Sequence, residues 1–210
     1  MRNILIVDDH EVVRDGVKNI LGEQASPTSF GEASTAPEAL HLVREQNWDL
    51  VILDLSLAGR NGLELLKQLK QIRPELPVLI LSMHSEEQYA RRAFKAGAAG
   101  YITKDRSRTE LAEAVNKVAE GGRYVSAALA ERLIIDIQRD TTRPLHEGLS
   151  DREFEVMCLI ASGKTVSQIG EFLSLSDKTI STYRARILEK MGMRTNAELM
   201  HYGIQNHLVD

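Results

Sequence analysis

The chain has 210 residues, 43% of them apolar and 27% charged, which is typical of a globular protein with one large domain or two small ones. Its single cysteine, Cys158, excludes an intramolecular disulfide, and its net charge of −4 excludes a generally basic nucleic-acid-binding protein. No apolar run approaches the roughly 18 residues that a membrane-spanning helix needs, so we expect a cytoplasmic protein without a membrane segment.

Short apolar runs alternate with helical patterns through the first part of the chain. Four runs, at 4–7, 50–53, 78–81 and 100–103, are typical of strands buried on both faces, and a weaker strand is expected at 28–33. Apolar residues at helical spacing follow each run, at 12–21, 36–43, 63–72, 88–96 and 111–119. This alternation predicts a parallel α/β sheet with helices on both faces, within a domain that covers residues 1–122.

The pattern changes after residue 122. Residues 123–148 are expected to hold a helical segment, with apolar residues spaced from Leu129 to Ile137, and then a polar linker. From 149 to 210 the chain is predicted to be all-helical, and Ser150 with Glu153 has the spacing of a capping box. The expected helices run from 150 to 163, from 167 to 173, from 176 to 191, and onward from 196.

Polar residues follow the predicted buried strands. Asp8 and Asp9 end the first strand, Asp54 follows the third, Ser82 the fourth and Lys104 the fifth. In an open parallel sheet, ligands bind beyond the carboxyl ends of the strands, where the strand order reverses. A flavodoxin-like (βα)5 fold with order 2-1-3-4-5 would place the first and third strands side by side at that point.

Three neighbouring carboxylates raise one another's pKa, and a hard divalent cation such as Mg²⁺ relieves that repulsion. An aspartate beside the ion can accept a phosphoryl group. Lys104 would then hold a phosphate oxygen as a point charge, and Ser82 could donate a hydrogen bond to another.

The first 122 residues resemble the receiver domain of two-component response regulators. The resemblance rests on "DDH" at 8–10, Asp54 in "VILDLSLAGRNG", Ser82 in "LSMHS", and "AGAAGYITK" ending at Lys104. It implies phosphorylation of Asp54 by a histidine kinase. It also implies a Mg²⁺ site made by Asp8, Asp9, Asp54 and the backbone carbonyl of Ser56. Three further residues are implied to bind or respond to the phosphate: Ser82, Tyr101 and Lys104.

Residues 149–210 resemble the LuxR-type helix-turn-helix of the NarL/FixJ subfamily, with departures at Gly170, Ser181 and Tyr183. This resemblance implies binding to double-stranded DNA. On the helix from 177 to 191, Ile180, Ile187 and Met191 form a buried stripe, and the opposite face carries small and cationic residues. Base contacts are expected from Lys178, Ser181, Thr182 and Ala185, and phosphate contacts from Tyr183, Arg186 and Lys190.

Three functions compete on these patterns. A phosphorylation-controlled transcription regulator, with a phosphorylation-linked homodimer, accounts for both halves of the chain. A phosphohydrolase with Asp54 as nucleophile would need a second aspartate two residues later, where Ser56 stands. A phosphorylation switch that acts on RNA or on another protein is the third.

Overall fold

The computed structural model describes residues 2–23, 27–57, 60–131 and 144–209. The chain divides into two compact units, Met1–Leu133 and Ile134–Asp210. The finer boundaries expected at 122 and 149 stay predictions. Part of the helix expected up to Ile137, and part of the polar linker, lie outside the described residues.

The first unit is built on a parallel five-stranded sheet. Its strands have the order β2-β1-β3-β6-β7, which is the predicted order 2-1-3-4-5. A short antiparallel pair, which the sequence pattern did not predict, follows the third sheet strand. The strands are β1 (Arg2–Val7), β2 (Thr28–Ala33), β3 (Leu50–Leu53), β4 (Ser56–Leu57), β5 (Arg60–Asn61), β6 (Val78–Ser82) and β7 (Gly100–Thr103).

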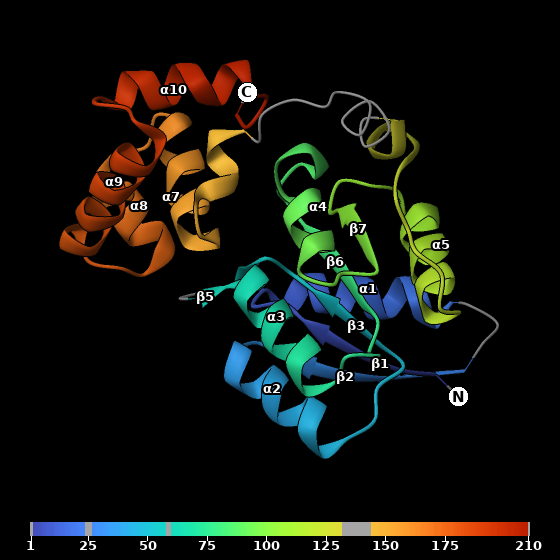
Figure 1. Ribbon diagram of the computed structural model, residues 1–210. Coiled ribbons are helices and arrows are strands. Elements are labelled where there is room, and N and C mark those ends of the chain that lie inside the picture. Colours follow the sequence, from blue (N-terminus) through green and yellow to red (C-terminus); the bar gives the residue numbers. More distant parts are fainter. Residues whose placement is uncertain (1, 24–26, 58–59, 132–143, 210) are drawn as a thin grey trace. The chain divides into compact units, whose positions relative to one another are not determined.

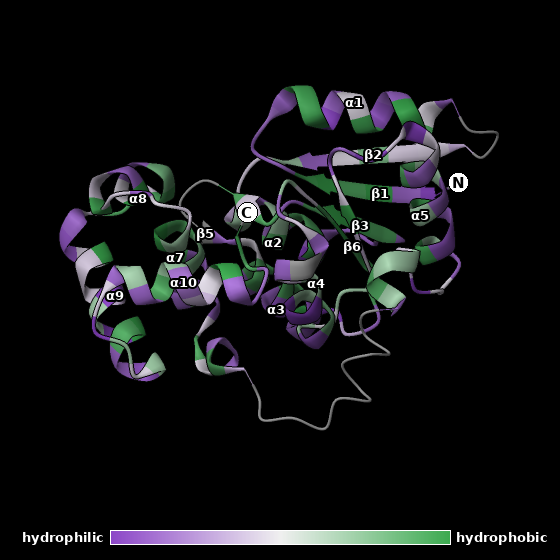
Figure 2. Cartoon of the chain, turned by 90° about the horizontal axis from the view of Figure 1, so that it is seen from above, coloured by the Kyte–Doolittle hydropathy of each residue, from purple (hydrophilic) through white to green (hydrophobic). Residues whose placement is uncertain are grey.

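Helices cover both faces of this sheet (Figure 1). Two lie against one face, α1 (Glu11–Gly22) and α5 (Arg108–Ala119). Three lie against the other, α2 (Ala36–Glu45), α3 (Gly62–Ile72) and α4 (Glu86–Lys95). Apolar side chains of α1 and α5 pack with the central strands in one buried core, and these strands are the most uniformly hydrophobic part of the unit (Figure 2). The short apolar runs of the central strands are therefore buried on both sides, as predicted, whereas β2 is mostly half-buried.

The second unit is helical in its described part. It contains the 3-10 turn η1 (Leu145–Gly148), α7 (Asp151–Ala161), α8 (Val166–Leu173), α9 (Asp177–Met191) and α10 (Asn196–Gln205). The predicted capping box is present at the start of α7, where Ser150 and Glu153 each satisfy the other's backbone N–H. Ser176 caps α9, and Gly192 ends it with a φ of 65°.

No helix in the described ranges combines the length and the hydropathy that crossing a bilayer requires.

Candidate functional site

The register of the sheet brings the first two predicted site residues together. β1 pairs with β3 so that Val7 lies opposite Leu53, and the amide of Asp54 donates to the carbonyl of Val7 at 2.9 Å. Asp8 and Asp54 therefore leave neighbouring strands at the same level of the sheet edge. Both are buried, with 2% of each residue exposed.

The register on the other side brings the lysine to the same edge. Ser82 pairs with Thr103, and the amide of Lys104 donates to the carbonyl of Ser82 at 2.9 Å. The ammonium of Lys104 reaches across to the carboxylates. Its Nζ lies 2.7 Å from Asp8 Oδ2 and 2.7 Å from Asp54 Oδ2.

A cluster of possible cation ligands adjoins this lysine. Asp8, Asp9, His10 and Asp54 each offer a ligand atom, and these atoms lie within 4.8 Å of one another. Carboxylate oxygens are the ligands that Mg²⁺ prefers, so the donor set fits that ion. His10, to which the sequence analysis gave no role in the site, belongs to the cluster, with Nδ1 2.8 Å from Asp9 Oδ1.

The two charges at the centre of the site shift each other's pKa. Burial raises the pKa of Asp54 above its ordinary value, and the hydrogen bond from Lys104 only partly offsets this. Burial alone would lower the pKa of Lys104, but its bonds to Asp54 and Asp8 outweigh that effect and raise it. The lysine is therefore held as a cation among carboxylates.

Ser82 and Tyr101 are both fully buried beside the site. The Ser82 hydroxyl accepts from the amide of His84 at 3.2 Å, and the Tyr101 hydroxyl donates to the carbonyl of His84 at 2.9 Å. Burial strongly raises the pKa of Tyr101, so it stays a donor. The ring of Tyr101 thus lies inside the protein in this structure, and its response to a phosphate stays a prediction.

The turn after Asp54 is held by its own polar groups. The amide of Ser56 donates to Asp54 Oδ1 at 3.1 Å, which fixes one oxygen of the carboxylate. Ser56 Oγ lies 3.1 Å from His84 Nε2, a contact that joins the loops after β3 and β6 and that sequence spacing does not reveal. Gly62 closes the turn, where a Cβ atom would lie 2.7 Å from the Asp54 carbonyl oxygen.

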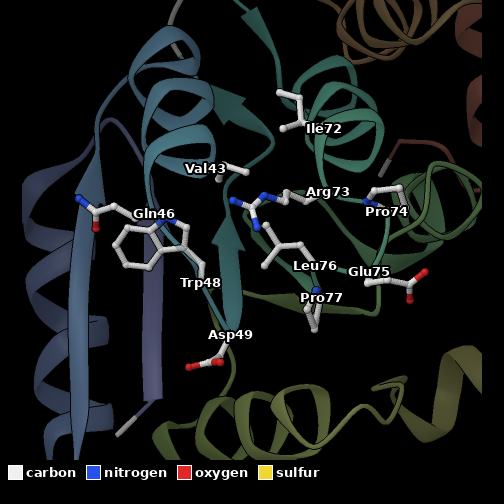
Figure 3. Close-up of a pocket in the computed structure, with 10 residues that line it drawn as sticks. All are labelled: Val43, Gln46, Trp48, Asp49, Ile72, Arg73, Pro74, Glu75, Leu76 and Pro77. Atoms are coloured by element: carbon white, nitrogen blue, oxygen red, sulfur yellow. The ribbon is translucent and has the colours of Figure 1, made fainter.

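A separate cavity of about 420 Å³ lies at the opposite end of the strands, before β3 and β6 (Figure 3). It is lined largely by apolar side chains, with Trp48 on one side and Pro77 on another. Trp48 Nε1 donates to the carbonyl of Leu42 at 3.1 Å. Asp49, at its rim, accepts from the amide of Asn3 at 2.7 Å. The described residues that line this cavity include no lysine, in contrast to the site at the other end of the strands.

In the second unit, α9 has the two faces that its sequence predicts. Ile180, Ile187 and Met191 are buried. Among the residues expected to contact DNA, Tyr183 is half-buried. The others are exposed: Lys178, Ser181, Thr182, Ala185, Arg186 and Lys190. Thr182 Oγ1 also donates to the carbonyl of Lys178 at 2.9 Å.

Two cations of α9 bond to neighbouring elements. Lys190 Nζ lies 2.6 Å from Glu153 Oε2, in the capping box of α7. Arg184 Nε donates to Asn196 Oδ1 at 2.6 Å, at the start of α10. A DNA phosphate would therefore have to compete with Glu153 for Lys190, whereas the structure gives Arg186 an exposed place on the outer face.

The turn between α8 and α9 explains one departure from the LuxR-type pattern. A Cβ atom at Gly170 would lie 2.7 Å from the carbonyl oxygen of Leu175 and 3.1 Å from Asp177 Oδ1. Asp177 in turn accepts from the hydroxyl of Ser167 at 2.6 Å. The missing side chain at Gly170 lets α8 approach the first turn of α9 closely.

A buried aspartate beside a lysine and an acidic pair, at the switch point of a 2-1-3-4-5 sheet, defines the class of receiver domains. The family described as response regulator receiver domain matches residues 4–116, and the bacterial regulatory proteins of the luxR family match residues 147–203. The chain belongs to the two-component response regulators that carry a LuxR-type DNA-binding domain, and it acts as a DNA-binding transcription regulator.

Relatives and solved structures match nearly the whole chain. Response regulator UvrY of Escherichia coli strain K12 is 34% identical over 99% of this chain and 96% of its own. Response regulator GacA of Pseudomonas aeruginosa is 33% identical over 100% of this chain and 99% of its own. The structure of the response regulator RcsB in complex with DNA is 26% identical, covers 96% of each chain, and has a TM-score of 0.59.

Proposed function

We propose that Asp54 is the phosphoacceptor, that a histidine kinase is its donor, and that phosphorylation controls dimerisation and binding to double-stranded DNA. The observation that carries this proposal is the bridge of Lys104 Nζ, 2.7 Å from both Asp8 and Asp54. A cation already seated against the nucleophile's carboxylate is placed to hold an oxygen of an incoming phosphoryl group.

In the proposed step, a carboxylate oxygen of Asp54 attacks the phosphorus of a phosphohistidine. The phosphorus–nitrogen bond breaks, its electron pair stays on the imidazole nitrogen, and that nitrogen takes a proton from solvent. Lys104 then bonds one phosphoryl oxygen, and the Ser82 hydroxyl turns to donate to another. Water attack on the phosphorus later releases inorganic phosphate and restores the carboxylate. The protein thus supports its own phosphorylation and dephosphorylation, with phosphohistidine and water as the co-reactants.

The acidic cluster fits Mg²⁺, held by Asp8, Asp9, Asp54 and the backbone carbonyl of Ser56. When bound, this ion supplies positive charge next to the phosphoryl oxygens. The chain's own part is to hold Asp54 Oδ1 through the amide of Ser56, at 3.1 Å, while Oδ2 faces Lys104.

For the output, we propose that α9 enters the major groove of DNA. Its exposed small side chains, Ser181, Thr182 and Ala185, allow close approach, and Lys178 and Arg186 supply charge. We assign receiver function to residues 1–122, a connecting segment to 123–148, and DNA binding to 149–210. A homodimer would match two DNA half-sites, as helix-turn-helix proteins commonly require.

The test uses the full chain with beryllofluoride and Mg²⁺, a stable mimic of the phosphorylated aspartate. Duplexes selected from a random pool by the wild-type protein serve as ligand, with scrambled duplexes as the control. We expect tighter binding to the selected duplex and a larger mass in ultracentrifugation, both lost in Asp54→Asn. Equal affinity and mass with and without beryllofluoride would contradict the proposal, and binding confined to single-stranded RNA would favour the competing RNA output.

A further inference from the structure

The segment that follows α5 is bound to the edge of the receiver sheet. Tyr124 pairs with Gly100 in a parallel bridge, its amide donating to the carbonyl of Ala99 at 3.0 Å. The amide of Tyr101 donates to the carbonyl of Tyr124 at 3.4 Å. A Cβ atom at Gly100 would lie 3.0 Å from Tyr124 Cβ, so the two backbones approach closely. The sequence pattern predicted this stretch as a connecting segment, without any attachment to the sheet.

Two residues farther along, Ser126 fastens the same segment to the start of α4. Its hydroxyl donates to Glu86 Oε2, and Ser126 Oγ in turn accepts from the amide of Leu129 at 3.2 Å. The second bond caps the helical residues 127–131. Glu86 is 8% exposed, and its other oxygen, Oε1, lies 4.0 Å from Arg106 Nη2. The hydroxyl of Ser126 thus connects the helical residues 127–131, called the linker helix below, to the buried carboxylate of Glu86.

The loops of the phosphoacceptor site and this segment line one common cavity of about 280 Å³. Lys104 and Arg106 come from the loop after β7, and Met83 from the loop after β6. Leu129, which is buried, comes from the linker helix. A displacement of either loop therefore changes the walls against which the linker packs.

Tyr101 connects the same parts through its two ends. Its hydroxyl donates to the carbonyl of His84 at 2.9 Å, and its amide reaches Tyr124. His84 also donates its amide to Ser82 Oγ at 3.2 Å, and it precedes Glu86 by two residues. These contacts connect the site with β7, β7 with the segment after α5, and that segment with the start of α4.

We propose that Glu86 and Ser126 are positioning residues that couple the state of Asp54 to the linker. This proposal rests on the proposed phosphorylation of Asp54. With Asp54 ionised, the Glu86–Ser126 bond holds the linker helix on the receiver. When the Ser82 hydroxyl turns to a phosphoryl oxygen, the amide of His84 loses its acceptor, and Lys104 draws the loop after β7 with it. Both loops bordering Glu86 then shift, and the segment that leads to the DNA-binding unit is released.

The substitution Ser126→Asp removes the hydrogen bond to Glu86 but keeps the cap of the linker helix. Aspartate is a good N-cap, so the linker helix keeps its start, but its carboxylate faces that of Glu86 and repels it. Glu86→Gln in the same chain restores a bond, because the amide can donate to the new aspartate. Ser34→Asp is the matched control, because Ser34 Oγ likewise donates to a glutamate, Glu38, at 3.1 Å within the first unit.

The measurements are amide hydrogen exchange over residues 122–131 and affinity for a selected DNA duplex, each with and without beryllofluoride and Mg²⁺. In the wild type we expect the phosphate mimic to speed exchange of the Tyr124 amide, whose acceptor is the Ala99 carbonyl, about tenfold, the scale of one lost hydrogen bond to a charged group. Ser126→Asp should show the fast exchange without the mimic, and its gain in DNA affinity on adding the mimic should fall about tenfold. Ser126→Asp with Glu86→Gln, and Ser34→Asp, should behave like the wild type.

Exchange that is equal in the wild type and Ser126→Asp without the mimic overturns the anchoring role, whatever happens at Asp54. Exchange that the mimic leaves unchanged, although it tightens DNA binding of the wild type, overturns the coupling and leaves the proposed function standing. If the mimic changes neither the DNA affinity nor the mass of the wild type, the proposed function is contradicted. In that case, hydrogen exchange of Ser126→Asp, compared with that of Ser126→Asp with Glu86→Gln, still tests whether Ser126 anchors the segment.

Discussion

The carboxyl edge of the receiver sheet and the outer face of α9, which we propose to carry the two halves of the function, are built in opposite ways. At the sheet edge, Asp8 and Asp54 are buried and bonded to one lysine. On α9, Lys178 and Arg186 are exposed on a face of small side chains. The first proposed site is assembled before any ligand arrives, whereas the second would be completed only by the surface that it meets.

This difference decides how each site responds to change. A buried, bonded charge cannot be removed without altering its partners, so substitutions at the sheet edge act on the whole cluster. Exposed charges act one at a time and are screened by salt. The contrast gives four expectations, from loss of function down to a modest pH effect.

The largest effect is expected at Asp54. Asp54→Asn keeps the shape of the side chain but removes the nucleophilic oxygen, so incorporation of one phosphoryl group per chain from a small phosphodonor with Mg²⁺ should be lost. Mass spectrometry of the intact protein measures it. Asp49→Asn is the control, because Asp49 stands exposed at the other end of β3. Labelling of Asp54→Asn to the wild-type level would show that another residue accepts the group.

The next effect separates two kinds of contact on α9. Lys178→Ala should cost about 1–3 kcal/mol of binding free energy on the cognate duplex and relax specificity at one base pair. Arg186→Ala should weaken binding to every sequence and reduce the slope of log affinity against log salt by about one. Binding titrations on cognate and scrambled duplexes across a salt series measure both.

Lys190→Ala provides the comparison for those titrations. Its ammonium bonds Glu153 at 2.6 Å, so we expect a smaller change of salt slope than for Arg186→Ala, together with a less stable second unit. Wild-type binding by both Lys178→Ala and Arg186→Ala would remove α9 as the reading element.

Two helical glycines should respond in opposite directions to alanine. At Gly170 the added Cβ atom would lie 2.7 Å from the carbonyl oxygen of Leu175, and such crowding typically costs about 1–3 kcal/mol of unfolding free energy. At Gly16, within α1, no atom lies within 4 Å of the added Cβ atom, so the better helix propensity of alanine should add up to about 1 kcal/mol. Urea unfolding of the full chain measures both, and equal shifts would show that α8 and α9 separate readily.

The smallest effect is a pH-dependent gain of stability in Asp54→Asn. Burial raises the pKa of Asp54 above its ordinary value of 3.8, so the folded protein binds this proton more tightly than the unfolded chain does. The ionised carboxylate therefore subtracts from stability at neutral pH, and protonation removes that penalty as the pH falls through the raised pKa toward 3.8.

Without Mg²⁺, Asp54→Asn should thus be more stable than the wild type at pH 7, with the difference shrinking in acid. Thermal unfolding at a series of pH values measures it. A difference that grows on acidification would mean that Lys104 lowers the pKa of Asp54 more than burial raises it.

The sequence predicted the sheet edge well because strand ends are encoded locally. Asp8, Asp54, Ser82 and Lys104 each follow a buried apolar run, and the fold alone brings such ends together. The cap of α9 by Ser176 and its stop at Gly192 were equally readable from spacing.

Contacts between residues that are distant in sequence could not be predicted from the sequence pattern. The bond of Ser56 with His84 spans 28 positions, and that of Lys190 with Glu153 spans 37. The attachment of Tyr124 and Ser126 to the receiver was missed for the same reason. Each joins residues that local patterns treat as solvent-exposed loop or helix residues, and only the packed structure selects their partners.

The position of Trp48 has a practical consequence for spectroscopy. It is the only tryptophan in the chain, and its indole packs over β2, where a Cβ atom at Gly31 would lie 2.1 Å from it. Its intrinsic fluorescence therefore reports melting of the sheet in the first unit and leaves the second unit unseen, whereas far-ultraviolet circular dichroism registers the helices of both. Recording the two signals in one denaturation resolves whether the units unfold together or in sequence, without any attached dye.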